Sequence, residues 1–386
     1  MDFELDAAQR QLKDRIDRFV VERYALARPD AGASLWREFG ALGLLGLPFD
    51  REDGGGGGGP VETMVVMEAL GRALAPEPYL SSVVLAGSLL RAAGSASQRQ
   101  TFVPRLAAGD MRMAFAHAER QARYTLHDVA LAAAPCAGGY VLSGEKTLVL
   151  DGEGAETLIV SARTSGMTRS HSGISLFLVP ADAPGLTIVG YRTQDGRQAA
   201  DLVLDEVVVA GDRLLGSEGE ALATIERATD VTIAALAAEA VGVMAALYRL
   251  TIDFLKTRRQ FGQPLAFLQV PRHKAVDMFV ALEQAHSMAL YAAAMAEEPD
   301  AARRGPALAA AKVQINRSAR FIGQTAVQLH GAIGLTMDYL GARYFRRLMA
   351  IEASFGDTDY HLNRLIDDEN RRKDGDADWH WTEFWP

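Results

Sequence analysis

The sequence predicts an α+β protein in which a β-domain lies between two helical regions. Near the N-terminus, Leu12, Ile16 and Phe19 recur at the spacing of one buried helical stripe. From about residue 112, short β-branched runs alternate with Gly, Asp and Pro, which is typical of a sheet or barrel. From about Gly216 long helical patterns return, and the longest is too apolar all round for a surface helix.

The chain is therefore divided into four predicted parts. They are an N-terminal helical domain (1–111), a middle antiparallel β-barrel domain (112–214), a C-terminal four-helix bundle (215–368) and a Trp-rich tail (369–386). Six consecutive glycines, Gly54 to Gly59, interrupt the first part and are interpreted as an exposed flexible loop. Trp379, Trp381 and Trp385 crowd into the tail, and we expect them to dock on this chain or on a partner.

Composition narrows the class of protein. The 386 residues carry a formal net charge of -9, which argues against binding nucleic acid. The single cysteine, Cys136, excludes an intrachain disulfide and fits a reducing compartment. The N-terminus lacks signal-peptide features, and no apolar run is seen to approach the roughly 20 residues of a membrane span. Eight histidines show no metal-ligand spacing. We expect a cytoplasmic protein with no metal, no membrane contact and no nucleic acid.

Two stretches on the predicted bundle helices are specific. "LKTRRQFGQPLAFLQV" resembles the Arg-x-Gln-Phe-Gly signature of the acyl-CoA dehydrogenase family. "QLHGAIGLTMDYLGARYFRR" resembles that family's Gln-hydrophobic-His-Gly-Gly-x-Gly segment, with Ala332 in place of the second glycine. The resemblance extends over essentially the whole chain. It implies FAD as cofactor, pairing of subunits, an acyl-CoA substrate and an electron-transfer flavoprotein as acceptor.

In that family, a carboxylate removes the α-proton of the acyl thioester while the β-hydrogen leaves as hydride to the flavin. The FAD nucleotide is held largely by residues that reach across from the neighbouring subunit. The resemblance assigns that role to Arg258, Gln260, Phe261 and Gln328, with the backbone of Leu329, Gly331 and Ala332. Each of them alone is equally well interpreted as a surface charge, a core residue or a helix cap. Together they favour a cofactor site shared across a subunit interface.

The residues with which a subunit of this family contacts its own flavin are largely replaced in this chain. Against the family's Thr-Glu-Pro-x-x-Gly-Ser-Asp segment, only Glu119 is kept. Ala118, Arg120 and Tyr124 stand where the family has Thr, Pro and Ser. Where the family has an aromatic residue and a Thr or Ser beside the ring, the chain has Leu148 and Leu150. Two hydroxyl donors and one stacking surface are missing.

The usual catalytic base is missing as well. Its position falls on Phe355, and the alternative position used by a minority of the family falls on Thr232, beside Ile233 where Arg is usual. Glu239 and Asp357 are the remaining candidates for a relocated base. Glu239 is more simply interpreted as a buried ion pair, for example with Arg249, and Glu352 as a surface charge.

The losses are not scattered, since contacts to a neighbour's flavin are kept and contacts to the chain's own are replaced. The sequence therefore predicts an auxiliary subunit that completes the FAD site of a catalytic large subunit. Three arrangements remain open. In the other two, the chain pairs with a second copy of itself and works autonomously with a relocated carboxylate, or it is a non-enzymatic binding or assembly protein on the same fold.

Overall fold

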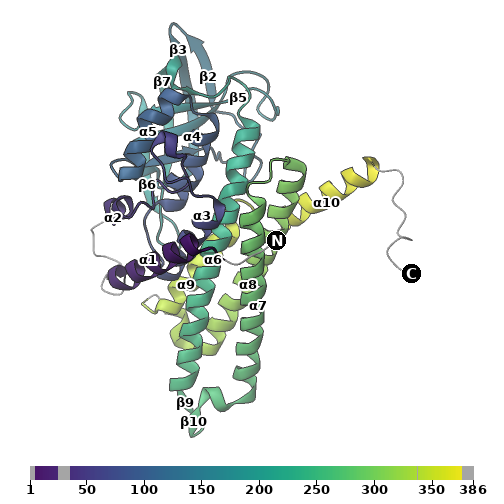
Figure 1. Ribbon diagram of the computed structural model, residues 1–386. Coiled ribbons are helices and arrows are strands. Elements are labelled where there is room, and N and C mark those ends of the chain that lie inside the picture. The colour runs from purple at the N-terminus through teal and green to yellow at the C-terminus, as the bar shows by residue number, and fades with distance from the viewer. Residues whose placement is uncertain (1–4, 25–34, 337, 376–386) are drawn as a thin grey trace.

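The computed structural model describes residues 5–24, 35–336 and 338–375. The Trp-rich docking tail predicted from the sequence lies outside these residues. Within them the chain folds into helices, then a sheet, then helices again, which confirms the predicted α+β class (Figure 1).

The N-terminal part is helical. Its elements are α1 (Ala7–Tyr24), α2 (Trp36–Ala41), a 3₁₀ turn η1 (Arg51–Asp53), α3 (Pro60–Ala73), a π-helix η2 (Tyr79–Ala86), α4 (Gly87–Ala93) and α5 (Ala96–Ala108). Leu12 and Ile16 are buried as predicted, and Phe19 is half-buried with its ring 5.7 Å from that of Phe39. This amphipathic face packs α1 against the rest of the domain.

The glycine run differs from the predicted free loop. The amides of Gly56, Gly57 and Gly58 donate to the carbonyls of Gly46, Phe49 and Leu47 over 2.7–2.8 Å. A Cβ at Gly55 would lie 2.1 Å from the carbonyl oxygen of Phe49, so only glycine permits this approach. The run is part-exposed, but its backbone is held against the preceding segment.

The middle part is one eight-stranded sheet. Its strands are β1 (Met113–Ala116), β2 (Ala132–Cys136), β3 (Gly139–Leu150), β4 (Thr157–Arg163), β5 (Ile174–Pro180), β6 (Leu186–Arg192), β7 (Gln198–Ala210) and β8 (Leu214–Leu215). The order is β6-β7-β3-β2-β4-β5-β8, with β1 beside β4. Most neighbours are antiparallel as predicted, but β4 pairs in parallel with both β1 and β2. The pairing path therefore has ends at β6 and β8 and is not antiparallel throughout.

The C-terminal part is a bundle. Its elements are α6 (Leu222–Thr257), the hairpin β9 (Arg259–Gln260) and β10 (Gln263–Pro264), a 3₁₀ turn η5 (Leu265–Phe267), α7 (Gln269–Met295), α8 (Ala301–His330), a 3₁₀ turn η6 (Gly331–Leu335), α9 (Leu340–Ala353) and α10 (Thr358–Gly375). Among the described helices, α6 alone is long and apolar enough to cross a membrane by length and composition. The sequence expectation overlooks this window, of which 78% is buried inside the protein, as in the core helix of a bundle.

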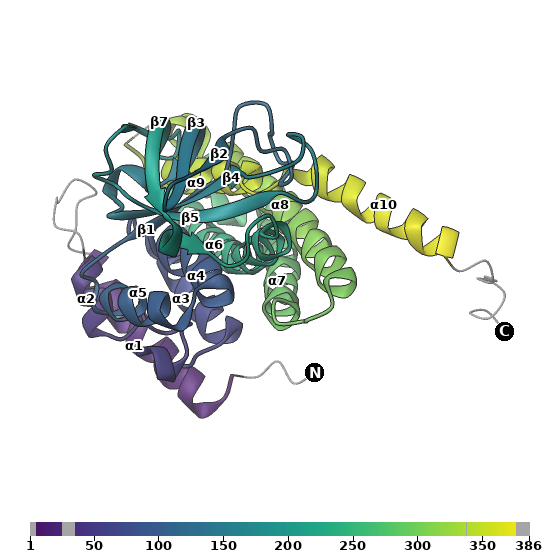
Figure 2. The ribbon, with the colours of Figure 1, turned by 90° about the horizontal axis from the view of Figure 1, so that it is seen from above.

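Two features of this arrangement position the functional residues. The N-terminal helices share one apolar core with the bundle, whereas the sheet has a core of its own. The sheet lies at one end of the molecule, and the hairpin β9–β10 lies at the opposite end of the long helices (Figure 1). Seen from above, α6 lies between the N-terminal helices on one side and α7 and α8 on the other, while α10 projects outward (Figure 2).

Candidate functional site

The hairpin after α6 presents the first predicted nucleotide-binding segment. Arg258 directly follows α6, and Gln260 lies on β9. Between the strands, Phe261 and Gly262 have φ of 53° and 78°, the pattern of a two-residue type I′ turn. Phe261 is 89% exposed. A phenylalanine held in the left-handed region with its ring in solvent is costly, by about 1–2 kcal/mol for the backbone alone. Such a position indicates a function outside the folded chain.

The second segment begins at the end of α8. Gln328 is exposed on its last turn, and Leu329 is half-buried. The helix ends at Gly331, whose φ of 67° turns the chain into η6, where Ala332 follows. Gly331 and Ala332 are exposed, and a Cβ built on Gly331 would meet no atom within 4 Å. Small residues here leave room for a ligand to approach the backbone.

Aromatic contacts bring the two segments together. The ring of His330, two residues after Gln328, lies 4.6 Å from that of Phe254, four residues before Arg258. His330 Nδ1 is 2.8 Å from the carbonyl oxygen of Ala326, while its buried Nε2 has no hydrogen-bond partner in the part of the chain that is described. Burial lowers the pKa of His330, so the ring is neutral. A buried, unsatisfied ring nitrogen beside two exposed motifs is what an incomplete binding site presents.

The charge of this end also fits a nucleotide. Arg258 and Arg259 are both exposed, and neither forms an ion pair with a described residue. Arg259 uses one Nη to donate to the carbonyl of Gly262, 3.2 Å away. Guanidinium groups are strong partners for phosphate oxygens. The residues present at the end of the bundle therefore fit the adenosine diphosphate half of FAD.

The flavin-ring side of the middle domain is built differently. Glu119, the retained residue, is buried and pairs with the buried Lys146 (Nζ–Oε1 2.7 Å). It also accepts the backbone amides of Ala130 and Leu131 at 2.8 and 3.1 Å. Burial opposes its ionisation, but Lys146 and these hydrogen bonds hold the pKa of Glu119 below its ordinary value. Glu119 thus anchors the loop between β1 and β2 and does not face a ligand.

The other ring-side positions are brought together but carry no free donor. Ala118 lies next to the β3 segment, since the amide of Thr147 donates to its carbonyl over 2.8 Å. The hydroxyl of Thr147 donates to the carboxylate of Asp201 over 2.7 Å. Leu148 has φ of 50° and is 51% exposed, and Leu150 is half-buried. Aliphatic side chains at these positions can neither hydrogen-bond nor stack on an isoalloxazine, so this side does not fit the flavin ring.

A contact between domains joins the same loop to the turn between α9 and α10. Arg123 stands at the position of the family's glycine and keeps a left-handed φ of 49°. Its guanidinium pairs with Asp357 at 3.2 Å. The rings of Tyr124 and Tyr360 lie 5.2 Å apart, and the Tyr360 hydroxyl donates to the carbonyl of Tyr124 over 3.2 Å. We call these four residues the domain bridge.

Phe355 lies directly beside the domain bridge. It is half-buried, with φ of 56°, and packs against two apolar clusters of the bundle. Its carbonyl accepts a hydrogen bond from His361 Nε2 at 2.9 Å, and burial lowers the pKa of His361 to about 3. The buried Lys312 holds the preceding turn by donating to the carbonyl of Ile351 over 2.6 Å. The position is rigid and apolar, without a proton acceptor on its side chain.

The minority base position is equally unsuited to proton transfer. Thr232 is fully buried and donates its hydroxyl to the carbonyl of Ala228 over 2.7 Å, and Ile233 belongs to the apolar core.

Glu239 forms the centre of a buried charge network. Its two carboxylate oxygens accept bonds from Nε and Nη2 of Arg347, and Oε1 also accepts one from Arg197, all at 2.8 Å. Arg347 in turn pairs with Asp195 at 2.8 Å. Burial opposes ionisation of Glu239, but the two arginines hold its pKa below the ordinary value. The ion-pair interpretation is confirmed, although the partners are Arg347 and Arg197, whereas Arg249 is exposed.

Two further carboxylates are engaged near Phe355. Asp357 uses Oδ2 for Arg123 and accepts the amide of Tyr360 on Oδ1 at 2.9 Å, so it caps α10. Glu352 is buried and pairs with Arg320 (Nε–Oε2 3.2 Å). The expectation that Glu352 is a surface charge is wrong, because it lies on the inner face of α9.

Helices, a sheet and a bundle, with an exposed cationic hairpin at the end of the bundle, are the arrangement of a flavin-linked dehydrogenase. Three models of one family match in chain order: the acyl-CoA dehydrogenase N-terminal domain at residues 6–110, its middle domain at 114–207 and its C-terminal domain at 222–368. The chain belongs to the acyl-CoA dehydrogenase family of FAD-dependent oxidoreductases.

Individual relatives agree with this placement over nearly the whole chain. A probable acyl-CoA dehydrogenase of Bacillus subtilis, YngJ, is 28% identical over 95% of this chain and 98% of its own. The Tcur3481-Tcur3483 steroid ACAD, solved as a variant, is 29% identical over 95% and 99%, with a TM-score of 0.83. Butyryl-CoA dehydrogenase of Megasphaera elsdenii is 25% identical over 96% and 100%, with a TM-score of 0.88.

Several important residues escape analysis of the sequence alone. Arg123 and Tyr360 are inconspicuous in the sequence, because nothing local shows that a β-domain loop reaches the turn before α10. Arg197 and Arg347 are 150 residues apart, and only the fold places both against Glu239. One signal was available for Arg123: it stands where the family has glycine.

Proposed function

We propose that this chain is a subunit of an FAD-dependent acyl-CoA dehydrogenase that completes the flavin site of a partner and lacks a working site of its own. The observation that carries the proposal is a contrast within one molecule. The nucleotide-binding residues are exposed at the tip of the bundle, whereas the ring side is aliphatic and its loop is tied to the bundle by the domain bridge.

The distance between the hairpin and the sheet supports a role in binding the cofactor of another chain. The hairpin that carries Gln260 and Phe261 lies at the far end of the bundle from the sheet (Figure 1). A 36-residue helix such as α6 is about 54 Å long at about 1.5 Å per residue. Residues so far from the sheet cannot contact a flavin whose ring lies on it, and a partner subunit is the remaining recipient.

The residues at the tip would act by holding the cofactor. Arg258 would neutralise the pyrophosphate, Phe261 would cover an apolar face of the nucleotide, and Gln328 would bond to the adenine end. FAD, when bound, supplies the hydride acceptor for desaturation. In the proposed pair the proton acceptor and the donors around the ring come from the catalytic subunit, because neither Phe355 nor Leu148 can provide them.

An apolar surface is available for the partner. Large apolar side chains are 47–68% exposed along η5 and α7, namely Phe267, Val270, Val276, Phe279 and Val280. Exposed apolar patches of this kind mark protein interfaces. In this proposal the partner is a catalytic large subunit of the same family, whereas a second copy of this chain would be the partner in the autonomous alternative. The Tcur3481-Tcur3483 steroid ACAD, by its name, joins two components.

The reaction of the proposed pair is α,β-desaturation of an acyl-CoA thioester, with an electron-transfer flavoprotein as acceptor. The likeness of the sequence to the small subunit of a pimeloyl-CoA dehydrogenase favours dicarboxylic or medium-to-long acyl chains.

The test is flavin stoichiometry. The chain is purified alone and together with a catalytic acyl-CoA dehydrogenase encoded beside it, and FAD is measured by absorbance. We expect colourless protein alone and one FAD per pair after co-purification. A yellow protein alone that oxidises an acyl-CoA would overturn the proposal, and a colourless protein that forms no flavin-containing pair would favour the binding or assembly role.

A second candidate is an autonomous dehydrogenase with a relocated base. Asp357 favours it, since its half-buried carboxylate lies two residues from the usual base position. Its bond to Arg123 would have to break first. Glu239 is enclosed by two arginines and would need a larger rearrangement. Turnover by the chain alone that is abolished in Asp357→Asn or in Glu239→Gln would establish this reading and identify the base.

A further inference from the structure

A cavity lies between the N-terminal helices and the first half of α6, away from both parts of the flavin machinery. Its volume is about 310 Å³. It is lined by Asp50, Ser88, Arg91, Ala92, Arg227, Ala228 and Val231. Cavities of this size are at the lower limit of small-molecule sites.

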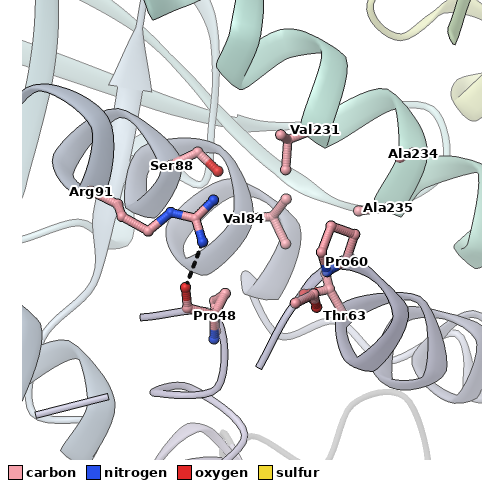
Figure 3. Close-up of a pocket in the computed structure, with 10 residues that line it drawn as sticks. Pro48, Pro60, Thr63, Val84, Ser88, Arg91, Val231, Ala234 and Ala235 are labelled. Carbon is pink, nitrogen blue, oxygen red and sulfur yellow. Dashed lines mark hydrogen bonds between the residues drawn. The ribbon is translucent and has the colours of Figure 1, made fainter. Parts of the chain in front are cut away.

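One wall of the cavity continues into an apolar recess. A neighbouring space of about 20 Å³ shares Ser88, Arg91 and Val231 with it. The recess is bounded by Val84 on η2 and by Ala234 and Ala235 on α6. Figure 3 shows Val84 and Val231 on the two facing helices, with Arg91 beside them. The recess has room for about one water molecule, so a larger ligand would lie in the cavity itself, against Ala92, Ala228 and Val231.

The mouth of the cavity carries two arginines without a carboxylate partner. Arg91 is half-buried and donates through Nη1 to the carbonyl of Pro48 at 2.9 Å, with no ion pair to any described residue. Arg227 is half-buried and likewise forms no ion pair within the described ranges. Asp230, which feels the charge of Arg227, is paired with Arg304 instead (2.9 Å). Asp50 on the rim is exposed, so two cations face one carboxylate.

The cavity is separate from the family's substrate-facing positions on α6. Arg227, Val231 and Ala234 recur at spacings of four and three residues and therefore share one helix face. Thr232, the minority base position, is turned from Val231 by about 100°. A ligand in the cavity would not occupy the place of an acyl thioester next to that position.

We propose that this cavity binds an aliphatic carboxylate, with the carboxylate between Arg91 and Arg227 and the chain along Ala92, Ala228 and Val231. Guanidinium groups bind carboxylates with two parallel hydrogen bonds. A volume of about 310 Å³ lies at the lower end of small-molecule sites and suits a short ligand such as octanoate. This inference does not depend on the proposed function, because it concerns a different surface.

The experiment is isothermal titration calorimetry of the full chain with sodium octanoate, 1-octanol and inorganic phosphate at fixed ionic strength. We expect saturable binding of octanoate and at least tenfold weaker binding of the other two probes. Equal affinity for phosphate would overturn the apolar part of the site, and equal affinity for octanol would overturn the role of the arginines.

Substitutions in the cavity test where octanoate binds. Arg227→Gln is expected to weaken octanoate binding about tenfold, and Ala92→Phe, which fills the mouth from an exposed position, is expected to abolish it. Arg249→Gln, on the same helix but exposed and 22 residues further along, serves as the control and should bind as the parent does. Folding of each variant is checked by its thermal unfolding. Absence of saturable binding, or parental affinity in both cavity variants, refutes the proposal.

Discussion

The two ends of this molecule use strained backbone for different purposes. At the tip of the bundle, Phe261 is held in the left-handed region and its ring projects into solvent. At the junction of sheet and bundle, Arg123 and Phe355 also have left-handed backbone, but Arg123 pairs with Asp357 on the surface and Phe355 packs against the bundle core. One end is open for a ligand from outside, whereas the other is satisfied by its own residues.

The two ends share a backbone conformation but differ in the chemistry of their side chains. Of seven non-glycine residues with positive φ in the described ranges, four lie at family site positions: Arg123, Leu148, Phe261 and Phe355. Left-handed backbone is thus found at positions that the family resemblance assigns to the site at both ends. In the proposed function, the side chains suit the cofactor only at the tip.

The largest effect is expected at the closed end. Arg347→Met leaves Glu239 buried with one arginine instead of two, and removing one partner of a buried pair costs about 3–5 kcal/mol. Urea unfolding measures this loss. Arg249→Met, an exposed arginine on α6, should change stability by less than about 0.5 kcal/mol. A similar small change for Arg347→Met would mean that the junction is not held by this network.

The next effect concerns the open end. Arg258→Ala in the co-purified pair removes a charged contact to the pyrophosphate, worth about 1.5–3 kcal/mol. We expect FAD to be retained about ten- to a hundredfold less tightly, measured by flavin release on dilution. The stability of the chain should not change, because Arg258 is exposed. Unaltered flavin retention would remove Arg258 from the site.

The two ends should also differ in how their stability depends on pH, because His361 is fully buried at the junction of sheet and bundle. Its pKa is lowered from 6.5 to about 3, so its stabilising contribution is complete above pH 6.5 and is lost as pH falls toward 3. Between pH 6.5 and 5 this amounts to about 2 kcal/mol. His361→Gln should flatten the dependence of urea unfolding on pH in that interval. A slope equal to that of the parent would show that His361 does not titrate as described.

A smaller effect separates strain from function at the open end. Phe261→Gly relieves a left-handed residue and should raise the free energy of unfolding by about 1 kcal/mol. The same change should weaken flavin retention by the pair. Met167→Ala, at an exposed position of the middle domain, should have neither effect. If Phe261→Gly were destabilising, the turn would be serving the fold and not a ligand.

The smallest expected effect is on turnover. Phe355→Glu restores a carboxylate at the usual base position, yet acyl-CoA oxidation by the chain alone should stay undetectable, because the domain bridge and the aliphatic ring side remain. Measurable oxidation by this variant would mean that the base was the sole missing part.

The sequence predicts the architecture well because its signals are local. The apolar periodicity of α6 and the β-branched runs of the sheet report secondary structure directly. The nucleotide-binding segments are continuous motifs and can likewise be found by eye. The contacts that close the other end could not be predicted, since Arg123 meets Asp357 across 234 residues of sequence. The firm attachment of the glycine run could not be predicted for a different reason: its partners are only 8 to 11 residues away, but glycines carry no side-chain pattern that specifies backbone hydrogen bonds.

The left-handed φ values have a consequence for anyone who wishes to redesign this protein. Loop grafting is usually the hard step in installing a new active centre, because the main chain must adopt conformations that its residues disfavour. At Leu148 and Phe355 the main chain already holds such a conformation with bulky side chains in place, so a polar side chain can be introduced at either position without new backbone strain.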